Sequence, residues 1–209
     1  MIAVLFATNR EARPFLTLVG AEPLEAQPFA VYKSPAYSRL RIVISRMGKI
    51  AAATACQAMI LRQGATRIVN PGACGALRDT PELAVGQLVR ISEASEGDHE
   101  IFGKRVAPVP CGAGLGAALP PARLVTSDRP VFDPVRRAEY AQFGDVVDME
   151  GAAVARAAAL YGVPCDLIKG ITDTALHLER EMLLRNLDTV CERLALFLRD
   201  ALSEWEHGQ

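Results

Sequence analysis

The sequence predicts a three-layer α/β domain, in which helices cover both faces of a mostly parallel sheet. Short apolar runs rich in β-branched residues and leucine recur along the chain, as in strands that are buried on both faces. Longer segments rich in alanine and leucine separate these runs, as expected of helices that connect parallel strands. With 209 residues and no visible repeat or linker, residues 1–209 are expected to form a single domain.

Each predicted element follows from its local pattern. Unbroken apolar runs that end at Gly, Pro or polar residues predict strands at 2–6, 40–45, 67–70, 87–91, 123–126, 145–147 and 164–170. Helix-forming segments between them predict helices at 49–63, 134–142 and 151–161, and from about 177 to 204. Residues 95–121 mix polar residues, prolines and the sequence CGAGLG, which indicates a flexible surface loop. This GxGxG lacks the preceding strand and the acidic residue of a dinucleotide site.

Composition excludes several classes of function. The net charge of -1 gives no reason to expect a nucleic-acid or membrane-surface partner, and no apolar run is long enough to span a bilayer. The five cysteines lack CxxC spacing and His99, His177 and His207 lack the spacing of metal ligands, so neither a disulfide framework nor a metal site is expected. Without a secretory signal, a reducing cytoplasm is the expected location.

Carboxylates follow the ends of predicted strands. Glu11 comes after IAVLFATNR, Glu150 after DVVDM and Asp173 after CDLIKGIT. Each alone suits a helix cap or a turn. Because the carboxyl ends of parallel strands lie on one edge of a sheet, the three side chains could also converge on a ligand site.

A glycine-rich segment, NPGACGAL (70–77), also follows a predicted strand. Its glycines would allow backbone N–H groups to approach a ligand closely, or they would simply make a tight strand-to-helix turn. Both interpretations stay open. Cys74 in this segment has no evident histidine partner, so we interpret it as a small packed side chain.

These residues lie in segments that together resemble one family. The segments are IAVLFATNREARPFL, RMGKIAAATA, VNPGACGAL, VGQLVRISEA and VVDMEGAAVARAAALYGVPCDLIKGITDTA. They resemble the nucleoside phosphorylase/nucleosidase superfamily of the purine nucleoside phosphorylase type, and within it the methylthioadenosine/S-adenosylhomocysteine nucleosidases. The resemblance implies a three-layer αβα sandwich with a central, mostly parallel and partly barrel-like mixed sheet. It also implies hydrolysis of a purine nucleoside without a cofactor, by a homodimer.

The resemblance implies a role for each acidic residue. Glu11 would activate the attacking water, and Asp173 would protonate the departing purine at N7. Glu150 would accept hydrogen bonds from the ribose hydroxyls, and Met149 would pack against the sugar. Asp148 matches no residue with a role in the family, and we expect it to face solvent.

Other positions are implied less directly. The segment that contains Ala73 and Gly75 resembles the one that lines the sugar site of the family. Phe132, with Val131 beside it, matches the position of an aromatic side chain that stacks on the base, although Phe132 would equally suit a core residue beneath this loop.

The chain also departs from the family pattern around the nucleophile. Asn70 and Ala73 stand where phosphorolytic members have an Arg and a Ser that hold phosphate, which favours water as the nucleophile. Lys169 replaces an Arg of the nucleosidases, and lysine cannot form a bidentate fork. A futalosine-type hydrolase, a phosphorylase and a relative that binds a nucleoside without turnover therefore remain as alternatives.

Overall fold

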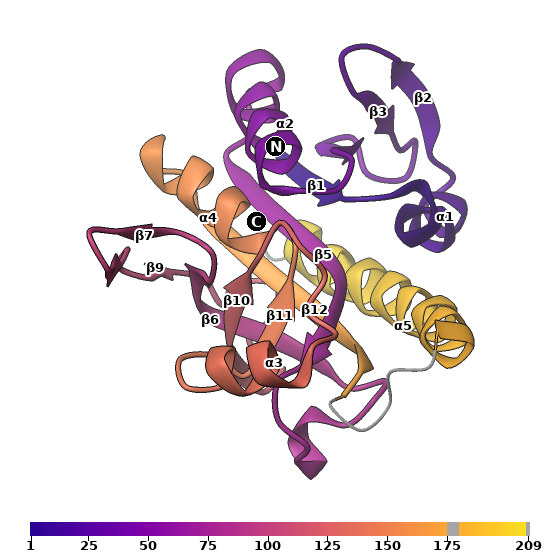
Figure 1. Ribbon diagram of the computed structural model, residues 1–209. Coiled ribbons are helices and arrows are strands. Elements are labelled where there is room, and N and C mark those ends of the chain that lie inside the picture. The colour runs from indigo at the N-terminus through magenta and orange to yellow at the C-terminus, as the bar shows by residue number, and fades with distance from the viewer. Residues whose placement is uncertain (175–179, 208–209) are drawn as a thin grey trace.

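A computed structural model of the chain describes residues 1–174 and 180–207, and its central feature is a mixed sheet in the order β11-β10-β6-β12-β5-β1-β4-β3-β2 (Figure 1). Its strands are β1 (Ile2–Phe6), β2 (Glu22–Glu25), β3 (Ala30–Lys33), β4 (Leu40–Ile44), β5 (Arg67–Ala76), β6 (Leu88–Glu96), β10 (Pro121–Thr126), β11 (Val146–Asp148) and β12 (Cys165–Asp173). The helices are α1 (Asn9–Leu18), α2 (Lys49–Gln63), α3 (Pro134–Tyr140), α4 (Gly151–Leu160) and α5 (Arg180–His207), with a short 3-10 turn at Pro81–Leu83.

Four of the helices form two layers, α2 with α4 on one side of the sheet and α1 with α5 on the other (Figure 1). Along β1, Ala3 and Leu5 belong to the apolar cluster that includes α2 and α4, whereas Ile2, Val4 and Phe6 belong to the cluster that includes α1 and α5. This alternation follows from the two-residue period of a strand. The predicted three-layer αβα architecture is therefore confirmed.

β5 changes its neighbour along its length, and this change closes part of the sheet. Its first residues pair in parallel with β1 from Arg67 to Val69, and its last pair antiparallel with β11 at Gly75 and Ala76. β12 accompanies β5 on the other side throughout. The strands β5, β12, β6, β10 and β11 thus form a closed ring, which confirms the partly barrel-like mixed sheet.

Several local predictions were wrong in instructive ways. Of the two interpretations left open for the glycine-rich segment, the tight turn is wrong, because the segment continues β5 in extended conformation to Ala76. Glu11 lies in the first turn of α1, which we did not predict, and the hairpin of β2 and β3 was also missed. The predicted start of the last helix, residue 177, lies outside the described residues.

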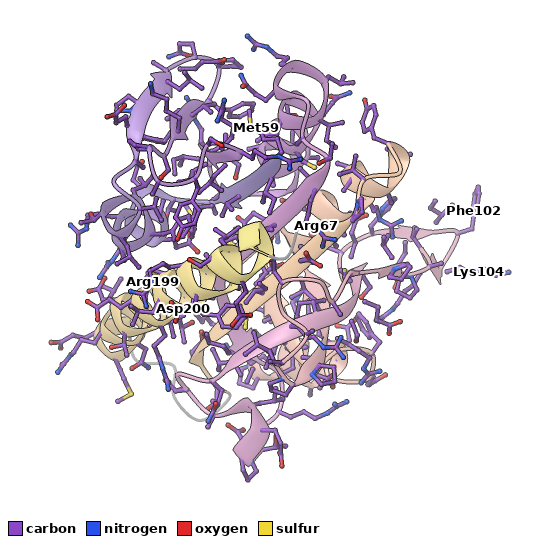
Figure 2. All side chains as sticks on the ribbon, turned by 180° about the vertical axis from the view of Figure 1, so that it is seen from behind. Met59, Arg67, Phe102, Lys104, Arg199 and Asp200 are labelled. Carbon is purple, nitrogen blue, oxygen red and sulfur yellow. The ribbon has the colours of Figure 1, made fainter. Side chains whose placement is uncertain are left out.

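The segment 95–121 is partly regular and not simply a loop. β6 extends to Glu96, β7 (Glu100–Ile101) and β8 (Lys104–Arg105) form a hairpin, and β9 (Val109–Pro110) pairs with β6. Figure 2 shows this hairpin projecting from the molecule with Phe102 and Lys104 at its end. Phe102 is 99% exposed. Over the described residues, no helix combines the length and apolarity needed to cross a bilayer.

Candidate active site

A pocket of about 320 Å³ opens beside the part of β5 that lies between its pairing with β1 and its pairing with β11. The ends of β1, β5, β11 and β12 contribute to its wall, together with α5 and the loop before α3. Its lining includes the predicted site residues Glu11, Val131, Phe132, Ala73, Gly75, Met149, Glu150 and Asp173. Lys169 is the exception, since it is absent from this lining.

Glu11 is held by the start of α1. Thr8 is the N-cap of this helix, and its backbone N–H and hydroxyl both donate to Glu11 Oε2 at 2.9 Å. The other carboxylate oxygen, Oε1, accepts from the N–H of Ala73 at 3.2 Å. These bonds fix the carboxylate over the middle of β5, where that strand has neither β1 nor β11 beside it. The Thr-x-x-Glu spacing of a capping box was the signal that could have predicted this helix.

Glu150 lies at the junction of β11 and α4, nearly buried. Gly48 N–H donates to Glu150 Oε1 at 2.8 Å, and Gly48 has a φ of 96°, a conformation that favours glycine. Burial, followed by the negative charge of Asp148, raises the pKa of Glu150 to about 7. The Gly48 hydrogen bond and the charge of Lys169 oppose this rise. Glu150 is thus a carboxyl group that changes charge near neutral pH.

Asp148 does not face solvent, contrary to the expectation from the sequence. It is buried and pairs with the ammonium group of Lys169 at 2.9 Å. It also accepts from the hydroxyl of Thr126 at 2.6 Å and from the N–H of Gly151 at 2.9 Å. With these partners its carboxylate joins β10, β11, β12 and the start of α4, so its role here is structural.

Lys169 lies in the middle of β12, 1% exposed. Besides Asp148, its ammonium group donates to Asn70 Oδ1 at 2.8 Å, and Asn70 in turn donates to the carbonyl of Leu5 at 2.8 Å. Burial by itself lowers the pKa of Lys169, but Asp148, Glu150 and Glu11 outweigh it and the pKa is raised. Lys169 is therefore a buried cation behind the acidic residues of the pocket.

Asp173 ends β12 and is buried in an ion pair with Arg137 of α3. Thr172 donates its hydroxyl to Asp173 Oδ1 at 2.8 Å, and Arg137 donates to Oδ2. Asp173 is the acceptor in both hydrogen bonds, as expected of a carboxylate. Arg137 lines the pocket and was missed at the sequence level, because a basic residue within an exposed-looking helix gives no sign of burial.

Glycines allow these charged groups to lie close to β5. A Cβ atom on Gly75 would come within 2.7 Å of Asp173 Oδ2 and 3.1 Å of Arg137 Nη2. A Cβ atom on Gly72 would lie 3.2 Å from Glu11 Oε1. The glycine-rich segment therefore leaves room for acidic side chains against a strand, rather than forming a tight turn.

Apart from Arg129, the remaining walls of the pocket are mostly apolar. Phe132 is 49% exposed and Val131 is buried, and both lie in the loop before α3. Met47, Leu183 and Leu187 also line the pocket and were not predicted. Cys74 lies in the wall as well, and burial raises the pKa of its thiol well above the usual value, which is unsuitable for a nucleophile.

The arrangement combines acidic groups at one end with an apolar cavity. Two of the buried carboxylates are neutralised by cations, Asp148 by Lys169 and Asp173 by Arg137. Glu11 and Glu150 have no ion pair among the described residues and bond only to backbone N–H groups and the Thr8 hydroxyl. Such a site can bind hydroxyl groups, activate water and stabilise positive charge on a ligand.

Comparison with known proteins identifies the family. The family model of the phosphorylase superfamily matches residues 2–203. The chain belongs to the phosphorylase superfamily. This membership confirms the resemblance inferred from its sequence motifs, and the family is enzymatic.

Relatives within this superfamily are nucleosidases. The chain is 27% identical over 201 residues to an aminodeoxyfutalosine nucleosidase of Campylobacter jejuni, covering 83% of this chain and 86% of that protein. It is 29% identical over 162 residues to a 5′-methylthioadenosine/S-adenosylhomocysteine nucleosidase of Shewanella putrefaciens, covering 64% and 68%. Its fold is similar to that of the 5′-methylthioadenosine/S-adenosylhomocysteine nucleosidase of Helicobacter pylori, with a TM-score of 0.86, 21% identity and 97% of each chain covered.

The buried pair of Lys169 and Asp148 generates a prediction about stability. Replacing Lys169 with Met leaves a buried carboxylate without its cation, so we expect Lys169→Met to lower the free energy of unfolding by about 3 kcal/mol. Urea denaturation measures this change. Lys33→Met, which removes a largely exposed pair with Glu22, is the matched control and is expected to cost less than about 1 kcal/mol. Equal stability of the two variants would contradict the importance of the buried pair.

Proposed function

We propose that this protein hydrolyses the N-glycosidic bond of a purine nucleoside and releases the free base and the sugar. The observation that carries the proposal is the meeting of Glu11, Glu150 and Asp173 in one pocket with an apolar wall. Cleavage of a C–N glycosidic bond develops positive charge on the sugar and negative charge on the base. The carboxylates of the site can stabilise the positive charge on the sugar, and Asp173 with its partner Arg137 can stabilise the negative charge on the base.

Glu11 is proposed as the general base. Its carboxylate is oriented by Thr8 and by the N–H of Ala73, so one face of it can bind the attacking water. As the water oxygen bonds to the anomeric carbon, one proton passes from water to Glu11 and the electrons of the C–N bond move onto the base. Catalysis by a positioned base contributes typically about 10²–10⁴-fold. Attack on the face opposite the departing base inverts the anomeric carbon.

Glu150 is proposed to bind the ribose hydroxyls. Gly48 uses one position on Oε1, and the remaining lone pairs of the carboxylate can accept hydrogen bonds from two hydroxyl groups. Met149, next to it in the pocket wall, packs against the sugar ring. The negative charge of ionised Glu150 near the sugar also stabilises an oxocarbenium-like transition state.

Asp173 is proposed to assist the departing base by protonating N7. Because Asp173 is the acceptor in its pair with Arg137, the proton that it passes to N7 as the C–N bond breaks is one that it first takes from solvent water, and the proton received by Glu11 returns to solvent afterwards. Phe132 and Val131 lie in the same pocket and form a surface on which a planar base can stack. The purine would thus lie between this loop and the end of β12.

Water rather than phosphate is the proposed nucleophile. Both polar groups of the Asn70 side chain are used internally, by Leu5 and Lys169, and Asn70 does not line the pocket. Ala73 has no side-chain donor, and its N–H bonds to Glu11. These residues supply no site for a phosphate dianion beside the carboxylate of Glu11, which would repel it.

The proposed substrate resembles methylthioadenosine or S-adenosylhomocysteine, a purine nucleoside with a 5′ substituent. Met47, Leu183 and Leu187 give the pocket the apolar surface that such a substituent needs. The similarity to the 5′-methylthioadenosine/S-adenosylhomocysteine nucleosidase of Shewanella putrefaciens supports this substrate class. A futalosine-type nucleoside is the second candidate, supported by the Campylobacter relative.

A product assay tests the proposed function. We expect release of free base and free sugar at a rate that does not change when phosphate is added. Glu11→Gln is expected to lower the rate by about 10²-fold or more because the glutamine amide cannot accept the proton of water. Glu82→Gln, on the exposed 3-10 turn, is the matched control. Formation of ribose 1-phosphate in proportion to added phosphate would overturn the hydrolytic mechanism.

The pKa of Glu150 predicts a dependence of nucleoside binding on pH. A carboxyl group whose pKa is about 7 is protonated below that pH and charged above it, so its capacity to accept hydrogen bonds from two hydroxyl groups rises through this range. We expect the affinity for an uncleavable C-nucleoside to fall roughly tenfold per pH unit below about pH 6. Calorimetric titration at a series of pH values measures this affinity. Glu150→Gln should bind weakly with no such dependence, and an equal slope in this variant would assign the titration to another group.

We further infer that the active form is a homodimer formed through α2 and α4. These helices lie side by side, joined by a 2.5 Å hydrogen bond from Gln57 to the hydroxyl of Tyr161. On α2, Ile50 and Leu61 are 83% and 62% exposed. Met47, which lines the pocket, precedes the same helix, so the apolar surface continues to the edge of the site.

Light scattering tests this inference with a charged substitution. Ile50→Glu places a carboxylate on the proposed contact, and we expect it to convert a dimer at micromolar concentration into a monomer with reduced activity. Val135→Glu, an equally exposed apolar position on α3, is expected to leave the dimer intact. A wild-type protein that is monomeric and fully active would refute the inference.

A further inference from the structure

Helix α2 begins without a cap of its own. Its N-cap residue is Gly48, which has no side chain to accept from the first N–H groups of the helix. The N–H of Gly48 donates instead to Glu150 Oε1 at 2.8 Å. The N–H of Lys49 donates to Asp128 Oδ1 at 2.9 Å. Two adjacent N–H groups at the start of α2 are therefore bonded to different carboxylates, of which Glu150 lines the pocket and Asp128 does not.

The segment between β4 and α2 has an unfavourable backbone conformation. Arg46 has a φ of 73° and Gly48 a φ of 96°, both in the left-handed region. Glycine adopts this region readily, whereas a residue with a Cβ atom, such as Arg46, does so only at a cost. Such a segment keeps its conformation only where surrounding contacts hold it in place. The bond between Lys49 N–H and Asp128 is one such contact, and it holds the end of the segment that bonds to Glu150.

Asp128 is itself fixed by Asp98, in the segment after β6. The N–H of Asp128 donates to Asp98 Oδ2 at 2.9 Å, and Asp98 Oδ1 accepts from the ammonium group of Lys49 at 2.6 Å. The same ammonium group donates to Glu96 Oε2 at 3.0 Å and lies 3.9 Å from Asp128 Oδ2. The backbone and the side chain of Lys49 are thus both bonded to one group of carboxylates. This arrangement fixes the first residue of α2 relative to β6 and to the segment after β10.

These carboxylates lie on a closely packed base. Gly97, between Glu96 and Asp98, donates its N–H to the carbonyl of Thr126 at 2.9 Å. A Cβ atom on Gly97 would come within 2.6 Å of the ring of Tyr140, a fully buried residue of α3. The end of β6 is therefore packed tightly against β10 and α3. Because packed interiors yield little, a carboxylate attached to this base can hold the start of α2 in one position.

We propose that Asp128 is a positioning residue for the proposed reaction: it holds the first turn of α2 where Gly48 can donate to Glu150, and so orients that carboxylate for the ribose. The inference rests on the proposed binding of ribose by Glu150, and it adds a residue that acts from outside the pocket. Among the residues that the structure describes, Gly48 N–H is the only hydrogen-bond donor to the carboxylate of Glu150. The orientation of Glu150 therefore depends on where α2 begins.

The bond from Gly48 also favours the charged form of Glu150. Burial, followed by the charges of Asp148 and Glu11, raises the pKa of Glu150 to about 7. The Gly48 bond and the charge of Lys169 oppose this rise. If the start of α2 moves away, the loss of the Gly48 bond raises the pKa further. Glu150 is then protonated at neutral pH and can accept fewer hydrogen bonds from the ribose hydroxyl groups.

The charge of Asp128 and its bond to α2 have opposite effects on Glu150. Loss of the negative charge alone favours ionisation of Glu150 and lowers its pKa, whereas a displaced start of α2 raises it. The sign of the change therefore separates the positioning role from a direct effect of charge. The other charged and titratable groups around Asp128 stay the same when Asp128 is replaced, and they are Lys49, Glu96, Asp98, His99, Arg129 and Arg156.

Carbon-13 NMR of protein labelled at the side-chain carboxyl of glutamate tests the proposal in the absence of a nucleoside. The signal of Glu150 is assigned by its loss in Glu150→Gln. We expect Asp128→Ala to raise the titration midpoint of Glu150 by about one pH unit, the effect of losing a hydrogen bond to a charged group. Asp128→Asn keeps an oxygen that accepts from Lys49 N–H but removes the charge, so its midpoint should not exceed that of the wild type.

Two further variants complete the test. Asp98→Ala removes the group that fixes Asp128, and it should raise the midpoint of Glu150 as well. Asp133→Ala is the matched control, because this exposed carboxylate of the same loop caps α3 by accepting from Arg136 N–H at 2.8 Å. It should destabilise the fold slightly without moving the midpoint. A rise in Asp133→Ala equal to that in Asp128→Ala would assign the effect to a loosened loop and contradict the positioning role.

Nucleoside binding and turnover separate this inference from the proposed function. We expect the pH below which an uncleavable C-nucleoside loses affinity to rise in Asp128→Ala by the same amount as the midpoint of Glu150. A raised midpoint in Asp128→Ala, with no binding or turnover of any nucleoside by the wild type, would support the positioning role and reject the hydrolase. Turnover by the wild type, with a midpoint in folded Asp128→Ala no higher than in Asp128→Asn, would overturn the positioning role and leave the hydrolase intact.

Discussion

The pairing of β11 with the end of β5 is the constraint on which the site depends. β5 leaves β1 after Val69 and meets β11 at Gly75, so residues 70–74 have β12 on one side and no strand on the other. Glu11 occupies this gap by bonding to the N–H of Ala73. The same pairing brings the end of β11, and with it Glu150, opposite the end of β12. An open parallel sheet would place the carboxylates along one edge, whereas the closed ring places them around one pocket.

Charge balance then distinguishes carboxylates that are paired with a cation of the protein from those that are not. Lys169 neutralises Asp148, and Arg137 neutralises Asp173. Glu11 and Glu150 remain without a cation of their own in the described part of the chain, and the pKa of Glu150 is raised to about 7 by burial and by Asp148. A positively charged sugar would supply the missing cation at the moment of bond cleavage, so the site is better matched to that transition state than to the neutral substrate.

The sequence predicted the layers and most strands because their signal is local, in runs of apolar residues. It also indicated that Glu11, Glu150 and Asp173 could converge, since each follows a strand, and the pocket brings these three together with Asp148. It could not predict the fate of Asp148 or Arg137, because each owes its burial to a partner distant in sequence, Lys169 and Asp173. Neither of the two interpretations left open for the glycine-rich segment included the role that Gly75 has in the structure, for a related reason. The glycines were interpreted as residues that give the backbone conformational freedom. In the structure, the missing side chain of Gly75 provides space for the charged side chains of Asp173 and Arg137. The capping box of Thr8 and Glu11 was local and could have been recognised.

Lys169 shows how one buried charge can act on groups that it does not contact. Its ammonium group bonds to Asp148 and Asn70, yet it lies only 3.6 Å from the place that a Cβ atom on Gly72 would occupy, and Glu11 Oε1 lies 3.2 Å from the same point. The absence of a side chain on Gly72 therefore lets the cation and the proposed base approach the same point. In a medium of low dielectric constant its charge favours the ionised form of Glu150 without removing the lone pairs of that carboxylate from the pocket. A guanidinium fork would bond to such a carboxylate directly, whereas a lysine anchored to Asp148 leaves both carboxylates available to water and sugar.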